Sequence, residues 1–255
     1  MNMKIKDSVC FVTGSGRGIG RAIVEELVKS GAAKVYASAR NAGALKDLAA
    51  ASKGKVVAVA LDVTNEDQIR AAAKAAPDTQ ILINNAGVAA YSAIIGSPDT
   101  VSVRQEMDVN FFGLMNMTRA FAPILKKNGG GALVNLSSVG GLVGIPLFGT
   151  YCATKAAVHS LTQSVRGELQ AQKTLVMGVY PGPIDTDMGA GVNMEKETPQ
   201  NVAREIFKGI ESGAEEVYPD KVSKDFAVRM KTDAKALEKE WSALLPQLTG
   251  VSAAK

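Results

Sequence analysis

Short apolar runs alternate with longer segments of mixed polarity along most of this chain. Each apolar run predicts a strand, at Val9–Thr13, Lys34–Ala39, Lys55–Leu61, Gln80–Asn84, Ala132–Ser137, Leu175–Tyr180 and Glu215–Tyr218. Apolar residues at helical spacing predict helices at Gly18–Ser30, Ala42–Ala51, Asn65–Ala76, Thr100–Lys126, Tyr151–Gln170 and Pro199–Ser212. Such alternation favours a parallel sheet covered on both faces. We therefore predict an α/β protein with a single-domain Rossmann fold, a doubly wound seven-stranded parallel sheet flanked by helices.

Two segments fall outside this alternation. Gly182–Thr198 is irregular and follows the end of a strand, so it is a candidate flap over a ligand, the alternative being an ordinary surface loop. Ser223–Leu245 is predicted to be a helix and contains the chain's single tryptophan, Trp241. This helix could cover a substrate pocket, pack on a partner subunit or cap the domain. Thr64 followed by Asp67 has the form of a capping box at the start of the third helix.

Composition and charge narrow the class of protein. The 255 residues are 46% hydrophobic and 21% charged, which suits one sizeable core. The net charge is +4, but the basic residues are scattered, so we expect no nucleic-acid partner. Neither Cys10 nor Cys152 suggests a disulfide framework, and both are expected to be packed residues. No membrane span, signal peptide or metal site is expected, and a cytoplasmic location is the default.

A glycine-rich turn follows the first predicted strand. Its residues are Thr13, Gly14, Ser15, Gly16, Arg17, Gly18, Ile19 and Gly20. A strand, a glycine turn and a helix together hold a pyrophosphate at the helix N-terminus, and glycines let the backbone approach the phosphates. The spacing differs from Gly-x-Gly-x-x-Gly because Ile19 occupies the sixth position, and no Gly-Lys-Ser/Thr ending supports a P-loop.

Tyr151 and Lys155 lie four residues apart in a predicted helix, so both side chains project from one face. A free tyrosine has a pKa of about 10, and a neighbouring lysine ammonium is expected to lower it. A tyrosine tuned in this way can give a proton to a carbonyl oxygen or take one from an alcohol. Ser138 lies thirteen residues before Tyr151.

Further motifs accompany the glycine turn and the tyrosine–lysine pair in a fixed order. They are Asp62-Val63, Asn84-Asn85-Ala86-Gly87, Asn110, Ser138 and Pro181-Gly182. With these motifs, the sequence from Ser8 to Tyr218 strongly resembles the short-chain dehydrogenase/reductase family. The resemblance implies a nicotinamide cofactor and hydride transfer between carbonyl and alcohol groups. It also implies one catalytic domain over residues 1–246, with a cofactor half at about 1–130, a catalytic and substrate half at about 131–246 and a disordered tail at 247–255.

The same resemblance implies which residues bind the cofactor. The Asp62 side chain and the Val63 amide would hold the adenine ring, and the segment after the fourth strand would leave room for the adenosine ribose. Thr186 would bond the nicotinamide carboxamide. The full predicted cofactor site comprises Gly14, Ser15, Gly16, Arg17, Gly18, Ile19, Gly20, Arg40, Asp62, Val63, Asn85, Ala86, Gly87, Tyr151, Lys155, Pro181, Gly182, Ile184 and Thr186.

Four residues are the predicted catalytic set by resemblance. Ser138 would hydrogen-bond the substrate carbonyl oxygen and Tyr151 would protonate it. Lys155 would assist Tyr151 and bind the nicotinamide ribose. Asn110 falls within a long predicted helix, where asparagine is unfavourable without a reason. The family gives that reason, a local kink that holds a water linking Lys155 to solvent.

The residue that ends the second strand bears on cofactor choice. In the family an acidic residue there bonds the ribose of NAD, but this chain has Arg40 and carries Arg17 inside the glycine turn. Two guanidinium groups can clamp a 2′-phosphate, which an aspartate would repel. The pattern therefore predicts NADP(H), the alternative being that both arginines are solvated surface charges.

The leading hypothesis is an NADPH-dependent, reversible carbonyl reductase acting on a small-molecule ketone or aldehyde. The alternative is a non-catalytic NADP(H)-binding sensor or interaction protein on the same fold. An epimerase or dehydratase is disfavoured by the short C-terminal part. Apolar residues at Val139–Phe148, with Met188 and Val192, indicate an apolar substrate. Small residues on the Tyr151–Gln170 helix, beside the Thr100–Lys126 helix, predict a homodimer or homotetramer.

Overall fold

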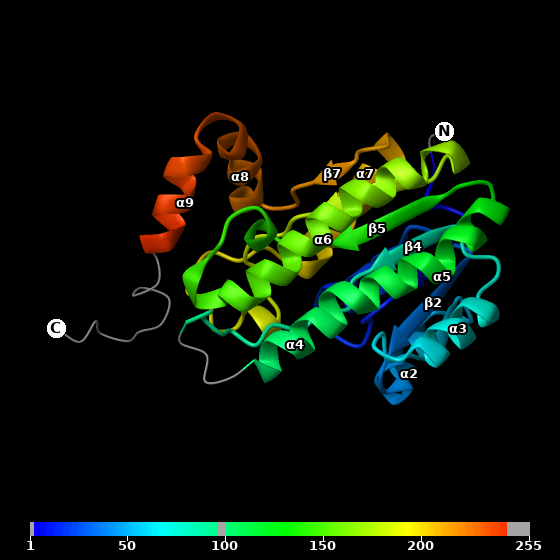
Figure 1. Cartoon of the computed structure of the whole chain (residues 1–255). Coiled ribbons are helices and arrows are strands. Elements are labelled where there is room, and N and C mark those ends of the chain that lie inside the picture. Colours follow the sequence, from blue (N-terminus) through cyan, green and yellow to red (C-terminus); the bar gives the residue numbers. More distant parts are fainter. Residues whose placement is uncertain (1–2, 96–99, 244–255) are drawn as a thin grey trace.

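A computed structural model describes residues 3–95 and 100–243, and its centre is a parallel sheet of seven strands in the order β3-β2-β1-β4-β5-β6-β7 (Figure 1). The strand and fold-class predictions are confirmed, and each strand end lies within one residue of its predicted position. The strands are β1 (Val9–Val12), β2 (Lys34–Ala39), β3 (Val56–Ala60), β4 (Ile81–Asn84), β5 (Ala132–Leu136), β6 (Leu175–Val179) and β7 (Glu216–Val217).

Helices cover both faces of the sheet. The described helices are α1 (Gly18–Lys29), α2 (Lys46–Ala51), α3 (Glu66–Ala75), α4 (Val101–Met107), α5 (Leu114–Lys127), α6 (Gly149–Glu168), α7 (Pro199–Ser212), α8 (Lys221–Thr232) and α9 (Ala234–Ala243). Strand alternation assigns side chains to the two faces. In β1, Cys10 and Val12 join the core under α1 and α7, whereas Phe11 joins the core under α3, α5 and α6.

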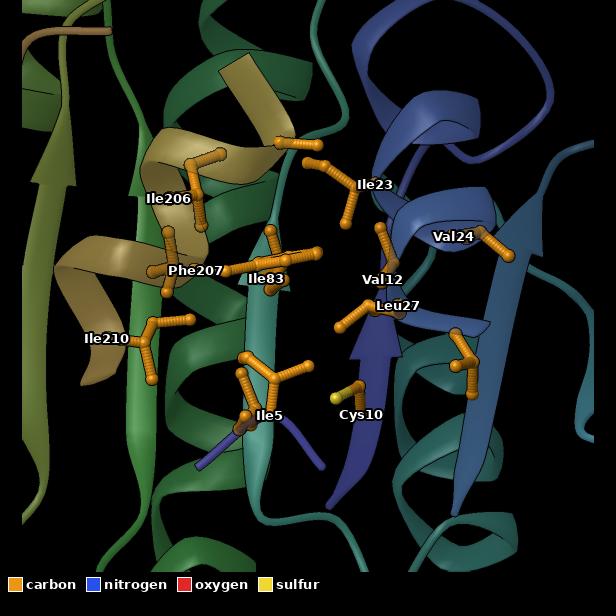
Figure 2. Packing of buried hydrophobic residues seen from close by; sticks show 14 of the residues in the cluster. Ile5, Cys10, Val12, Ile23, Val24, Leu27, Ile83, Ile206, Phe207 and Ile210 are labelled. Atoms are coloured by element: carbon orange, nitrogen blue, oxygen red, sulfur yellow. The ribbon is translucent and has the colours of Figure 1, made fainter. Parts of the chain in front are cut away.

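The core beneath α1 and α7 is built mainly from aliphatic side chains (Figure 2). Ile23 and Leu27 come from α1, and Ile206 and Phe207 come from α7; they pack with Val12 and its neighbours. Ile23 and Leu27 are four residues apart, as are Ile206 and Ile210 of the same cluster, which is the helical spacing seen in the sequence. Cys10 is fully buried here, as expected.

The prediction of one regular helix over Thr100–Lys126 is wrong. A π-helical turn at Asp108–Gly113, which contains the buried Asn110, separates α4 from α5. The predicted helix at Ala42–Ala51 likewise begins with a 3₁₀ turn, Ala42–Leu45, before α2.

Two further predictions of helix ends are corrected. Asn65, not Thr64, caps α3: its side chain accepts a hydrogen bond from the Gln68 amide, whereas Thr64 bonds Asp62. The predicted helix at Ser223–Leu245 is two helices, α8 and α9, because Asp233 adopts a non-helical conformation between them. The end of that prediction, and the predicted tail at 247–255, lie outside the described residues.

The candidate flap at 182–198 is closed at its base. Ile184 and Glu197 form an isolated bridge, the Asp185 amide donates to the Glu197 carbonyl at 2.8 Å, and the Glu197 amide donates to the Pro183 carbonyl at 3.0 Å. Between these points the described backbone contains only a short 3₁₀ turn, Asp187–Gly189. The irregularity predicted for this segment is confirmed.

No described helix is long and apolar enough to cross a membrane. Within the same part of the chain, no group of three or more His, Cys, Asp and Glu side chains is arranged to hold a metal ion.

The assembly remains a prediction, for which the fold provides a specific test. The π-helical turn packs against α6, and its Phe112 is 45% exposed. We expect light scattering at micromolar concentration to give at least twice the 26.6 kDa chain mass. Phe112→Glu should reduce that mass, because a charge would be desolvated in the two-fold interface. Val228→Glu, at an exposed position on α8, is the control and should leave the mass unchanged. A monomeric wild-type protein would refute the prediction.

Candidate active site

A cavity of about 910 Å³ opens along the carboxyl edge of the sheet. Residues that follow six of the strands line it, from the glycine turn after β1 to the flap after β6. All the predicted site residues line this cavity except Ser15 and Asn110. Ser15 is fully buried, and its hydroxyl donates to the Val12 carbonyl at 2.9 Å, so its side chain stabilises the turn from behind.

The glycine turn is held against the end of β4. The Asn85 side-chain amide donates to the Thr13 and Gly14 carbonyls at 2.9 and 3.2 Å, and the Thr13 hydroxyl accepts from the Asn85 amide at 2.9 Å. A Cβ on Gly20 would lie 2.2 Å from the Gly14 carbonyl oxygen. Gly14 and Gly18 have φ of 68° and 56°, a region that favours glycine.

This turn fits the pyrophosphate of a dinucleotide. The helix α1 begins at Gly18, and Arg17 caps it without a side-chain hydrogen bond, so the first amides of the helix face the cavity without a side-chain acceptor. A side chain on Gly18 would meet Thr186 of the flap at 3.3 Å. The predicted phosphate cradle and the predicted nicotinamide contact therefore lie side by side.

Ser138, Tyr151 and Lys155 converge on the cavity from β5 and α6. The Lys155 Nζ lies 5.5 Å from the centre of the Tyr151 ring and donates to the Leu136 carbonyl at 2.7 Å. The Ser138 hydroxyl accepts from the Gly140 amide at 3.1 Å. Ser137 points elsewhere: its hydroxyl donates to the Lys155 carbonyl at 3.0 Å, which is a structural contact.

Asn110 lies behind the cavity and connects three segments. Its Nδ2 donates to the Val88 carbonyl at 2.9 Å and to the Thr154 hydroxyl at 3.0 Å, while its Oδ1 accepts from the Val88 amide at 2.8 Å. The predicted kink at this asparagine is confirmed by the π-helical turn. These bonds attach α6 to the loop after β4. The water relay implied by resemblance stays a prediction.

Glu106 is a residue that the sequence analysis missed. It is 1% exposed, its Oε1 accepts from the Ala90 amide at 2.6 Å, and its Oε2 has no hydrogen-bond partner in the described part of the chain. This bond fixes the segment that leads to Tyr91 in the cavity wall. Its position four residues before Asn110, on the same helical face, was an available signal.

The adenosine end of the cavity is charged and exposed. Arg40 lines it and forms no ion pair with any residue the structure describes. Arg17 also lines it, but its guanidinium pairs with Asp187 of the flap at 3.2 Å, with both side chains about three-quarters exposed. Asp62 accepts from the Thr64 amide at 2.9 Å, which orients its carboxylate at the end of β3.

Comparison with known proteins agrees with this geometry. The family described as short chain dehydrogenase matches residues 8–197. The chain belongs to the short-chain dehydrogenase/reductase family. A curated relative, 3-ketodihydrosphingosine reductase of Bacteroides thetaiotaomicron, is 31% identical over 202 residues, which are 77% of this chain and 71% of the relative.

Solved structures of short-chain dehydrogenases match nearly the whole chain. One from Burkholderia cenocepacia in complex with NADP is 38% identical, with a TM-score of 0.89 over 94% of this chain and 99% of that one. One from Burkholderia phymatum in complex with NAD is 25% identical, with a TM-score of 0.81 over 93% and 96%. Membership of this family implies a nicotinamide cofactor. The solved neighbours include one complex with NADP and one with NAD.

The expected effect of Lys155 on Tyr151 is wrong. Burial raises the pKa of the Tyr151 hydroxyl above its ordinary value, and a hydrogen bond with Ser138 offsets only part of this. Desolvation lowers the pKa of Lys155 to about 8, and its ammonium is directed at the Leu136 carbonyl. At neutral pH Tyr151 therefore keeps its proton, which is the form that a proton donor requires.

Burial of Lys155 should destabilise this enzyme in a pH-dependent way. Between pH 8 and 10.5 the unfolded chain binds more protons than the folded one, so stability rises with pH there and the penalty is greatest below pH 8. The difference between the folded and unfolded pKa of Lys155 corresponds to a loss of about 3 kcal/mol in the free energy of unfolding below pH 8. Loss of the hydrogen bond from the charged ammonium to the Leu136 carbonyl offsets about 1.5 kcal/mol of this penalty in a variant.

We therefore expect Lys155→Met to raise the Tm at pH 7 by roughly 3–6 °C. The increase should shrink as the pH approaches 10.5. Thermal denaturation followed by circular dichroism across this range provides the measurement. Lys46→Met, at an exposed lysine, is the control and should show no such trend. A Lys155→Met protein less stable than the wild type at every pH would contradict the analysis.

Proposed function

We propose that this enzyme reduces a ketone or aldehyde to an alcohol with NADPH, in a reversible reaction. The observation that carries the proposal is the convergence of Ser138, Tyr151 and Lys155 on one cavity, where desolvation raises the pKa of the partly buried Tyr151 above its ordinary value. The name of the Bacteroides relative, a reductase of a 3-keto compound, supports carbonyl reduction.

In this proposal each side chain has one task. When bound, the nicotinamide cofactor supplies a hydride to the carbonyl carbon. The Tyr151 hydroxyl donates its proton to the carbonyl oxygen, and the Ser138 hydroxyl hydrogen-bonds the same oxygen as negative charge develops. Lys155 stabilises the resulting tyrosinate and delivers a replacement proton. Asn110 positions Lys155 by attaching α6 to the loop after β4.

Cofactor preference is assigned to Arg40. Its guanidinium lines the cavity next to the glycine turn and is not engaged by any described acidic side chain, so it can bind a 2′-phosphate without losing another partner. Arg17 would have to leave Asp187 to do the same. The NADP complex of the Burkholderia cenocepacia neighbour supports this preference, whereas the NAD complex of the other neighbour does not distinguish the two cofactors.

The function is tested by Tyr151→Phe. We expect kcat for ketone reduction to fall roughly 100- to 10,000-fold, because the general acid is lost. The ring is retained, so the Kd for NADPH should change little. A panel of ketones assayed by NADPH consumption gives the rates, and fluorescence titration gives the Kd. Tyr218→Phe removes a hydroxyl outside the cavity and is the matched control. Near-normal kcat in Tyr151→Phe would favour the non-catalytic alternative.

Cofactor preference is tested by Arg40→Asp. Loss of a charge-assisted phosphate contact costs on the order of 1.5–3 kcal/mol, so kcat/KM for NADPH should fall roughly 10- to 100-fold. The kcat/KM for NADH should stay unchanged or rise. Lys46→Asp makes the same charge change at a residue outside the cavity, and its NADPH/NADH ratio should match that of the wild type. Equal kcat/KM for both cofactors in the wild type would overturn the assignment.

A further inference from the structure

The C-terminal helices α8 and α9 contribute to the wall of the cavity. Trp241 of α9 lines the cavity and is only 7% exposed. Its ring meets Phe226 of α8 edge to face, with centroids 4.8 Å apart. Both rings belong to a third apolar cluster that includes Ile145 and Cys152. The apolar face of these helices is therefore turned towards the active site.

The two helices are held in this position by polar contacts. Asp220 caps α8 by accepting from the Ser223 amide at 2.9 Å, and its other oxygen accepts from the Gly182 amide at 2.8 Å. Arg229 of α8 pairs with Glu240 of α9 at 2.7 Å. The first contact links α8 to the predicted nicotinamide-binding loop, and the second fixes α9 against α8. Trp241 is thereby preorganised.

Apolar side chains continue from Trp241 around this end of the cavity. Phe148 and Met194 pack against the same cluster, and Tyr91 meets the Phe148 ring at 5.2 Å. Tyr91, Ile145, Phe148 and Met194 all line the cavity, and none carries a charge at neutral pH. Since Ile145 bonds Cys152, the residue next to Tyr151, this wall begins beside the proposed proton donor.

The order of the strands separates the apolar wall of the cavity from its charged adenosine end. Arg17, Arg40 and Asp62 follow β1, β2 and β3, which form one half of the sheet. Ser138 follows β5. The apolar residues follow β4, β5 and β6 or come from α9, beyond β7. A cofactor phosphate at one end therefore leaves the apolar end to the substrate.

We propose that Trp241, with Tyr91, Ile145, Phe148 and Met194, forms a subsite for a bulky apolar group attached to the substrate carbonyl. Trp241 sets the preference for large over small ketones. This inference rests on the proposed carbonyl reduction and adds the substrate class and the residue that selects it. Figure 1 shows α8 and α9 together at the end of the molecule near the start of α6, where Tyr151 lies.

Binding can be tested without turnover, because Trp241 is the only tryptophan in the chain. The full-length Tyr151→Phe variant is saturated with NADP⁺ and titrated with decalone, a bicyclic ketone, or with butanone. We expect a saturable change in tryptophan emission with decalone and none with butanone at the same concentration. No response to decalone, or an equal response to both, would overturn the subsite. This readout is independent of whether the protein catalyses ketone reduction.

Kinetics test the selectivity. Relative to the wild type, Trp241→Ala should lower kcat/KM for decalone roughly 10-fold or more, because a large buried contact is lost, with little change for butanone. Trp241→Phe should retain part of the selectivity. Val228→Ala, on the exposed face of α8, is the control and should change neither value. An unchanged decalone/butanone ratio in Trp241→Ala, with the Kd for NADPH intact, would refute the role of Trp241.

Absence of any ketone reduction by the wild type would instead refute the proposed function, while the fluorescence result would still decide whether the apolar subsite exists. The two ideas can therefore fail separately. Should Trp241→Ala fail to fold, Trp241→Phe and the emission of the native tryptophan keep the subsite testable.

Discussion

The backbone of the glycine turn lies closer to the end of β4 than any side chain would allow. A Cβ on Gly14 would lie 2.8 Å from the Ala86 Cα, a distance that real Cβ atoms do not tolerate. Asn85 maintains this approach by donating its backbone amide to the Thr13 hydroxyl and its side-chain amide to the Thr13 carbonyl. The geometry of the proposed cofactor site depends on this contact, because it sets where β1 and α1 stand relative to the rest of the sheet.

Buried side-chain amides connect the end of β4 to α6, the helix that carries the proposed catalytic residues Tyr151 and Lys155. The Asn84 side chain, next to Asn85, donates to Asn135 of β5 at 3.0 Å, and Asn135 donates to Thr162 of α6 at 3.0 Å. Buried amides of this kind are tolerated where they are paired, and they favour one arrangement of the elements; among the described residues, the Asn84 Oδ1 has no partner. These hydrogen bonds therefore fix the position of α6, which carries Tyr151, relative to the glycine turn.

The role proposed for Lys155 and the stability of the fold oppose each other. The lysine is 4% exposed and desolvation disfavours its charged form, although a carbonyl accepts one of its hydrogens. Glu106 is a second buried ionisable group near the cavity, with one oxygen unpartnered among the described residues. Both are costly in a protein interior, and such groups gather where chemistry requires them. The surrounding aliphatic core supplies the stability that these groups remove.

The sequence by itself determined the order of strands and helices, because apolar periodicity is local information. It also identified the glycine turn, the motif residues and the unfavourable asparagine at position 110. These signals are short-range: a tight turn with positive φ favours glycine, and an asparagine disturbs its own helix.

Only the tertiary structure decided the pKa of Tyr151, the burial of Glu106 and the direction of Trp241. Each depends on neighbours far away in the sequence. Desolvation raises the pKa of Tyr151, and the spacing of residues in the sequence carries no information about desolvation. Similarly, the break at Asp233 allows α9 to fold back on α8 and bring Trp241 to the cavity. Long-range burial, unlike periodicity, is a property of the folded chain alone.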